Sequence, residues 1–167
     1  MRNAGLIFAL TAAALAAACS SPTSSSELSR EITALRTATS RYHSFDAAVA
    51  DGYGTQLTDC MVDTSLGGMG AHYAKSSLID GSVSVTTPQV LLYEPQTDGS
   101  LQLVAVEYII PYTLRSRSAT PPVLFGQQFK QNDTFQLWGL HAWVWRSNPS
   151  GLFADWNPSV NCNAAMR

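Results

Sequence analysis

The sequence predicts an α+β fold in which one long N-terminal amphipathic helix packs on an antiparallel β-sheet and one disulfide closes the chain. Three observations support this class. Apolar residues follow a helical spacing early in the chain, and short segments of strand character come later. Two cysteines, Cys60 and Cys162, lie far apart in the sequence within the folded part of the chain and can form a disulfide. A helix that precedes the strands, instead of alternating with them, is typical of α+β proteins.

The predicted helix begins near Glu27 and ends at Asp51-Gly52. Serine side chains at residues 24–26 can cap its first turn, and Gly52 can adopt the left-handed conformation that ends helices. The pattern also allows a break near Thr39-Ser40. The apolar residues that recur at steps of three, four and seven, and so share one helical face, are Leu28, Ile32, Leu35, Tyr42, Phe45 and Val49.

Residues 53–68 are predicted to form a loop that carries Cys60, and the sheet follows it. Asp98-Gly99 between two strand candidates is typical of a β-hairpin turn. Residues 113–122 are predicted to form a loop, and the Pro-, Gly- and Asn-rich chain after Arg146 is predicted to wrap around the fold. The strand candidates are Met69–Lys75, Val90–Tyr93, Leu101–Ile110 and Phe135–Arg146.

The N-terminus predicts export. Arg2 is followed by an uncharged apolar stretch from Gly5 to Ala18, which is the pattern of a signal peptide and too short for a comfortable transmembrane helix. We therefore divide the chain into a signal peptide (1–18), a lipidated Ser-rich tether (19–26) and a single domain (27–167). Cys19 is the predicted lipidation site, which makes the membrane the expected partner and the cell envelope the expected location, at the outer membrane or cell surface.

The cysteine count supports this division. The sequence has three cysteines, and exported proteins tend to pair theirs. Cys60 and Cys162 are predicted to form a disulfide, which leaves Cys19 for the lipid. The alternative is ordinary secretion with cleavage after Ala16-Ala17-Ala18, since this triplet also fits an A-x-A site.

Composition excludes one class of partner. The formal net charge is −2 and only 13% of residues are charged, against a usual value of about 25%. This balance gives no basis for nucleic-acid binding. No complete catalytic motif is present, and the sequence identifies no cofactor.

Two polar residues interrupt apolar strand rows. With a period of two, Glu107 shares a face with Leu101, Leu103, Ala105 and Ile109, and His141 shares one with apolar residues from Phe135 to Trp145. His72 follows a Gly-rich segment. If the strands bring these faces together, His72, Glu107 and His141 form a two-histidine, one-carboxylate set that suits Zn²⁺ or a first-row transition metal.

The alternative for these three residues is structural, and sequence alone favours it. A single His or Glu on an apolar face is more often hydrogen-bonded within the core, and no H-x-H or H-E-x-x-H spacing forces these residues together. His43 is a weaker candidate for a further ligand. Trp143 and Trp145 share a face in this scheme and offer a stacking platform, although a core role is favoured for them.

Several segments resemble a group of bacterial secreted and lipoprotein sequences to which no activity is assigned. The resemblance extends from about Tyr42 to Cys162 and implies export and a single domain, but no mechanism. The segments that carry it are Gly67–Tyr73, Leu103–Tyr108, Leu124–Gln127, Leu140–Trp145, Asn148–Gly151 and Trp156–Pro158.

Three functions are compatible with the sequence. The favoured one is an exported envelope lipoprotein without catalytic activity that binds a small ligand, a metal or a partner. The second is a metal-dependent enzyme that uses His72, Glu107 and His141. The third is a structural or interaction protein without a pocket.

Overall fold

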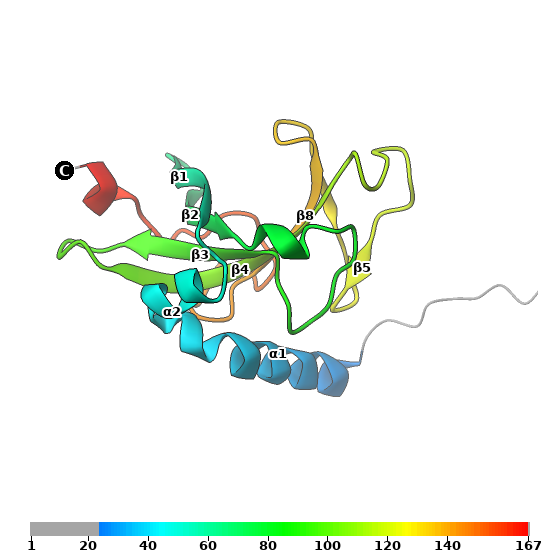
Figure 1. The fold of residues 1–167 in the computed structure, drawn as a ribbon, viewed down its shortest axis with the longest axis horizontal. Coiled ribbons are helices and arrows are strands. Elements are labelled where there is room, and N and C mark those ends of the chain that lie inside the picture. The colour runs from blue at the N-terminus through cyan, green and yellow to red at the C-terminus, as the bar shows by residue number, and fades with distance from the viewer. Residues whose placement is uncertain (1–23, 167) are drawn as a thin grey trace, which may run out of the picture.

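The computed structural model describes residues 24–166 (Figure 1). It confirms the predicted α+β class, the antiparallel sheet and the Cys60–Cys162 disulfide. The predictions for the signal peptide, for Cys19 and for most of the tether lie outside the described residues. Within residues 24–166, no helix has the length and apolar character needed to cross a membrane.

The helical region consists of three consecutive pieces. Helix α1 (Ser25–Thr39) begins two residues before the predicted start, because the Ser24 side chain accepts a hydrogen bond from the Glu27 amide. At the expected break the chain passes into the 3₁₀ helix η1 (Ser40–His43), and α2 (Phe45–Ala50) follows. In Figure 1 the helices lie together along one side of the sheet.

Six strands form the main sheet in the order β1-β2-β3-β4-β8-β7, with every neighbouring pair antiparallel. The short strands β5 and β6 pair separately. The turn with Gly99 at φ 84° joins β3 to β4, as predicted. The bounds are β1 (Thr55–Asp63), β2 (Gly67–Ala74), β3 (Val90–Pro95), β4 (Leu101–Pro111), β5 (Val123–Leu124), β6 (Gln127–Gln128), β7 (Lys130–Asn132) and β8 (Leu137–Ala142).

The prediction of a loop over residues 53–68 is wrong, because β1 occupies most of this range. β1 is an edge strand whose pairing with β2 shifts register three times, next to Thr58 and on both sides of Met61. All of its residues are exposed or half-buried. Each shift breaks the alternation of side chains, so the segment lacks the period of two that identifies a strand in a sequence.

The sheet separates two apolar cores. The core on the helix side contains Leu35 of α1 together with Leu91, Val106 and Leu140 from the central strands. The opposite core contains Val90, Leu92, Ala105, Ile109 and Trp143. Since side chains alternate between faces, residues paired with Val90 and Leu92 point to this second side. His72 pairs with Leu92, and Glu107 pairs with Val90 and with His141, so all three lie on the face away from the helices.

The prediction that Leu103 shares a face with Glu107 is wrong, because β4 contains a β-bulge between them. Leu92 pairs with Ala105 but the next residue, Tyr93, pairs with Leu103, which leaves Val104 as the extra residue. Leu103 therefore packs in the helix-side core, whereas Ala105 and Ile109 lie with Glu107 on the other face. The Val104 carbonyl accepts hydrogen bonds from the amides of Trp145 and Arg146.

The shared face predicted for Trp143 and Trp145 is also wrong. β8 ends at Ala142, and the chain then turns, so Trp143 enters the second core while Trp145 packs against the helix side. Trp138 and Trp143 are buried, in agreement with the core interpretation. Trp145 contacts His43 with ring centroids 4.4 Å apart, and its indole N–H donates to Thr39.

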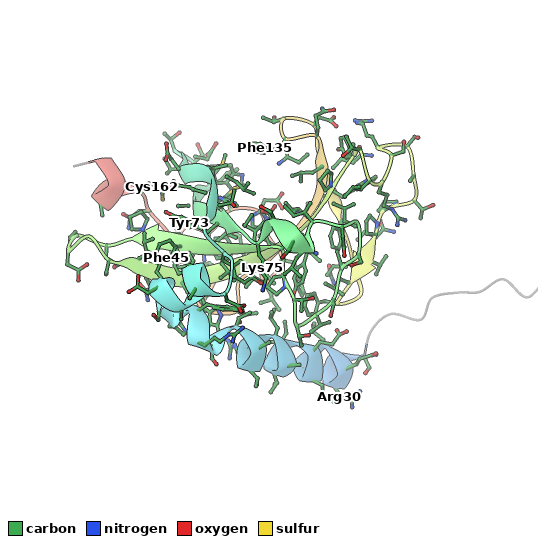
Figure 2. The ribbon with its side chains drawn as sticks, in the orientation of Figure 1. Arg30, Phe45, Tyr73, Lys75, Phe135 and Cys162 are labelled. Carbon is green, nitrogen blue, oxygen red and sulfur yellow. A yellow bond between two sulfur atoms is a disulfide. The ribbon has the colours of Figure 1, made fainter. Side chains whose placement is uncertain are left out.

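The disulfide joins β1 to the irregular C-terminal segment, across 102 residues of sequence. This segment also lies against the start of β2, where Gly68 and Asn157 exchange backbone hydrogen bonds. A Cβ at Gly67 would lie 2.3 Å from the Asn157 carbonyl oxygen, so only glycine permits this approach. Cys162 is labelled in Figure 2, where the C-terminal segment passes close to β1.

Candidate metal centre

The structure brings His72, Glu107 and His141 together on the face of the sheet away from the helices. One ligating atom from each residue lies within 4.8 Å of the other two. Glu107 and His141 are direct cross-strand partners on β4 and β8. His72 is on β2, which is separated from β4 by β3, so the curvature of the sheet must bring it to the same point.

His72 is held by the strand that sequence reasoning missed. Its Nδ1 lies 2.8 Å from the Thr58 hydroxyl of β1, within hydrogen-bond distance. Its Nε2 lies 3.7 Å from Oε2 of Glu107. An imidazole whose one nitrogen is fixed by a hydrogen bond presents the other nitrogen in a set direction, which is how metal-ligating histidines are usually oriented.

His141 has an unsatisfied nitrogen. Its Nε2 is buried and has no hydrogen-bond partner among the described residues, and it lies 3.8 Å from Oε1 of Glu107. Its Nδ1 is 3.9 Å from Oδ1 of Asp155, a carboxylate on the outer side of the ring. The ring of Trp143 lies nearly parallel to the imidazole. A buried ring nitrogen without a partner is uncommon in folded proteins, because it loses its bond to water without replacement.

Glu107 is a buried carboxyl group with 8% of its surface exposed. Gly139 leaves room for it, because a Cβ at that position would lie 3.0 Å from Oε1 of Glu107. Its two oxygens face different histidines, but both distances exceed the 3.2 Å upper range of an ordinary N–H···O bond. The three residues thus lie close together without hydrogen-bonding one another.

Burial determines the protonation states of Glu107, His72 and His141 when no metal is bound. It raises the pKa of Glu107 from 4.5 to about 8, with a further increase from the charge of Asp155. Burial lowers the pKa of His72 from 6.5 to about 3 and that of His141 to about 4. In each case the apolar surroundings favour the neutral form. At neutral pH both imidazoles therefore have free lone pairs, which is the state that binds metals.

The spacing suits a bound ion better than a hydrogen-bonded triad. Ligands at 2.0–2.2 Å from a tetrahedral Zn²⁺ are about 3.3–3.5 Å apart. The carboxylate–imidazole distances of 3.7 and 3.8 Å exceed this range by a few tenths of an ångström, and each ends on a different oxygen of Glu107. Ligating atoms of the three residues lie within 4.8 Å of one another, so a shared ion would require them to approach by up to about 1.3 Å. Three protein ligands leave one tetrahedral position open.

The three residues line a pocket of about 320 Å³. Apart from the site itself, Thr58 and Asn132 are the polar residues among its lining, and the rest are apolar. Figure 2 labels Phe135, which extends from the turn between β7 and β8 at the edge of this pocket. All three candidate ligands therefore adjoin a largely apolar space.

A second, more polar cleft adjoins the first and shares Glu107 and His141 with it. Lys130 and Asp155 line this cleft and form an ion pair of 2.8 Å. Among the described residues, these two are the charged side chains that line either space beside the three candidate ligands. The site thus separates an apolar side from a polar side.

Sequence reasoning found the three candidate ligands and missed the residues around them. Thr58 lies in the range predicted as a loop, and Asp155 lies in the C-terminal segment, where no periodicity indicates a position. His43 is not part of the site, since its ring packs on Trp145 at the other side of the sheet. No family model, curated protein or solved structure matches the chain.

Proposed function

We propose that this chain is an exported, lipid-anchored envelope protein whose domain binds a divalent transition-metal ion, Zn²⁺ in the first instance. His72, Glu107 and His141 are the ligands, and the fourth position is open to the apolar pocket. The export and the anchor at Cys19 rest on the N-terminal sequence and, separately, on the resemblance of the region from about Tyr42 to Cys162 to bacterial secreted and lipoprotein sequences. The metal site rests on the geometry of the domain.

One observation supports the metal site above all: the buried Nε2 of His141 without a hydrogen-bond partner among the described residues, 3.8 Å from the buried carboxyl group of Glu107. A structural triad would place its donors and acceptors at hydrogen-bond distance. A metal ion between them satisfies the orphaned nitrogen, the carboxylate and Nε2 of His72 together. It also offsets the cost of an ionised Glu107 in apolar surroundings.

The ligand types select the kind of ion. Two imidazoles and one carboxylate suit Zn²⁺ and other first-row transition metals. Mg²⁺ and Ca²⁺ prefer oxygen ligands in larger number, which this site does not supply. The hydroxyl of Thr58 on His72 corresponds to the outer contact that orients a metal-bound imidazole, whereas Asp155, at 3.9 Å from Nδ1 of His141, lies beyond hydrogen-bond distance.

Binding is favoured over catalysis by the pocket lining. A hydrolytic site needs an acid or base besides the ligands, within hydrogen-bond reach of the reacting atoms. Among the described residues on the apolar side, none that is titratable lines the pocket apart from the three ligands. Asp155 is on the polar side and is paired with Lys130. A metal-dependent enzyme remains the second candidate, on the strength of the open coordination position.

The metal site is tested by titration of chelator-treated protein with Zn²⁺, and with Co²⁺ followed by its visible spectrum. Wild type is expected to bind one equivalent. The His141→Ala variant is expected to lose binding by at least 100-fold, because it removes one of three protein ligands. His43→Ala is the matched control, since it removes a histidine that contacts Trp145 and is expected to bind as wild type does.

Stoichiometry and folding separate the alternatives. A Co²⁺ spectrum of tetrahedral type with one ion per chain supports the site. Wild type that stays metal-free at 100 μM Zn²⁺ while His141→Ala unfolds would show that the triad is structural. Glu107→Gln keeps the shape of the carboxyl side chain, so it tests metal binding even where His141→Ala does not fold.

The lipid anchor predicts covalent labelling of Cys19. Cells that express the chain and grow on an alkyne-tagged fatty acid are expected to yield labelled wild-type protein. Cys19→Ser is expected to remove the label, because the thiol is the attachment point. Cys60→Ser serves as the control for loss of a cysteine. Equal labelling of wild type and Cys19→Ser would show that Cys19 is not the attachment point. Soluble release of an unlabelled wild type would favour ordinary cleavage after Ala18.

A further inference from the structure

We propose that the pocket binds a medium-chain carboxylate, with the carboxylate on the metal ion and the hydrocarbon chain in the apolar space. This inference rests on the proposed metal site and deepens it by naming a ligand class. It is carried by three features of the described residues: an open ligand position, an apolar wall next to it, and the distribution of charge around it.

The wall beside the candidate ligands is made of flexible and branched apolar side chains. Two methionines from neighbouring strands lie in it, and methionine adapts its shape to variable apolar ligands. These side chains can bury a hydrocarbon chain but offer almost no hydrogen bonds to a sugar or a peptide. The apolar residues that line this wall include Leu57, Met61, Met69, Ile79, Phe135 and Leu137.

The space has the size of a small organic ligand. Its volume of about 320 Å³ is at the lower end of the range for ligand pockets, about 300–1,000 Å³. It corresponds to about ten water molecules at about 30 Å³ each. Leu57 and Phe135 are each 46% exposed, although both are large apolar side chains. They lie at the edge of the pocket on β1 and on the β7–β8 turn, where a bound chain would cover them.

Charge selects an anionic donor. With two neutral imidazoles and one carboxylate, a divalent ion leaves a net charge of +1 in a buried site. An anion in the open position neutralises this charge. The attraction between the two charges is strong because the surroundings are apolar. The described residues that line the apolar side include no lysine or arginine, and Lys130 in the adjoining cleft is paired with Asp155. The metal is therefore the group that would hold the carboxylate.

Calorimetric titration of the Zn²⁺-loaded full chain with octanoate, acetate and 1-octanol tests this inference. Each buried methylene strengthens binding by about fourfold, so octanoate is expected to bind at least about 100-fold more tightly than acetate. Octanol has the same chain without the anionic donor and is expected to bind at least tenfold more weakly than octanoate. Metal-free protein is expected to lose most of the octanoate affinity.

Surface variants supply the control. Leu57→Ser and Phe135→Ser replace exposed residues at the pocket edge, and each is expected to weaken octanoate binding by about tenfold with the Zn²⁺ affinity unchanged. Leu114→Ser is the matched control, because Leu114 is 52% exposed and does not line the pocket. It is expected to bind octanoate as wild type does.

The outcomes distinguish the two proposals. If Zn²⁺ binds but octanoate is no tighter than acetate, the ligand class is wrong and the metal site stands. If octanoate binds equally well without metal, or if Leu57→Ser and Leu114→Ser behave alike, the proposed pose is wrong. If Zn²⁺ itself does not bind, the metal site and the inference fall together.

Discussion

Metal-free Glu107→Gln protein is expected to become more stable than metal-free wild type as the pH rises from 4.5 to 8. The pKa of Glu107 is raised by burial from 4.5 to about 8, so the folded state favours the protonated form. The stabilisation from that proton is complete below pH 4.5 and is lost as the pH rises towards 8. The loss is on the order of 5 kcal/mol, at about 1.4 kcal/mol for each pKa unit. Glutamine cannot ionise, so the Glu107→Gln protein does not lose this stability as the pH rises.

Saturating Zn²⁺ is expected to reverse this order at pH 8. The ion binds the ionised carboxylate, so it stabilises wild type and adds little to Glu107→Gln. The histidines, whose pKa values are lowered, affect both proteins equally and cancel in the comparison. The measurement is the free energy of unfolding from urea titrations at several pH values, with and without Zn²⁺. A difference between the two metal-free proteins that does not change with pH would contradict the burial of an ionisable Glu107.

The Cys60→Ser/Cys162→Ser double variant is expected to be less stable than wild type by about 2–5 kcal/mol. The disulfide closes a loop of 102 residues, and a cross-link of this length removes much of the freedom of the unfolded chain. Urea unfolding of the oxidised wild type, the reduced wild type and the variant measures the effect. The reduced wild type is expected to match the variant.

The same variant is expected to bind Zn²⁺ more weakly, although it keeps all three ligands. Cys60 lies on β1, the edge strand that supplies Thr58 to His72. Without the cross-link, β1 is held by an irregular pairing to a single neighbour. Loss of an outer contact to a metal ligand typically weakens binding by about 10–100-fold. Cys19→Ser, which leaves the disulfide intact, is the control, and equal affinity in all three proteins would show that β1 is dispensable for the site.

The sequence predicts those parts of the fold in which one regular period continues without interruption. The alternation from Ala105 to Ile109 correctly places Glu107 on a buried face. Of the apolar residues with helical spacing, Leu35 is buried in the helix-side core, whereas Val49 is 44% exposed. The period fails where the backbone is irregular. Three register shifts hide β1, and the bulge at Val104 moves Leu103 to the opposite face.

The candidate site shows the same division between local and long-range information. A polar residue in an apolar row identifies Glu107 and His141 as unusual, and their pairing on β4 and β8 follows from antiparallel neighbours. The approach of His72 could not be predicted, because it comes from a strand two positions away and depends on the curvature of the whole sheet. The contacts of Thr58 and Asp155 depend on segments without any period.

The bulge at Val104 has a consequence for insertions and deletions. It changes the parity of β4, so that odd-numbered residues before it face the helices and odd-numbered residues after it face the pocket. A substitution at Val104 preserves this parity, whereas its deletion would turn Glu107 away from His141 or turn Leu103 out of the helix-side core. Length variation among related chains is therefore expected in the turn at Asp98-Gly99 and not between Leu103 and Glu107.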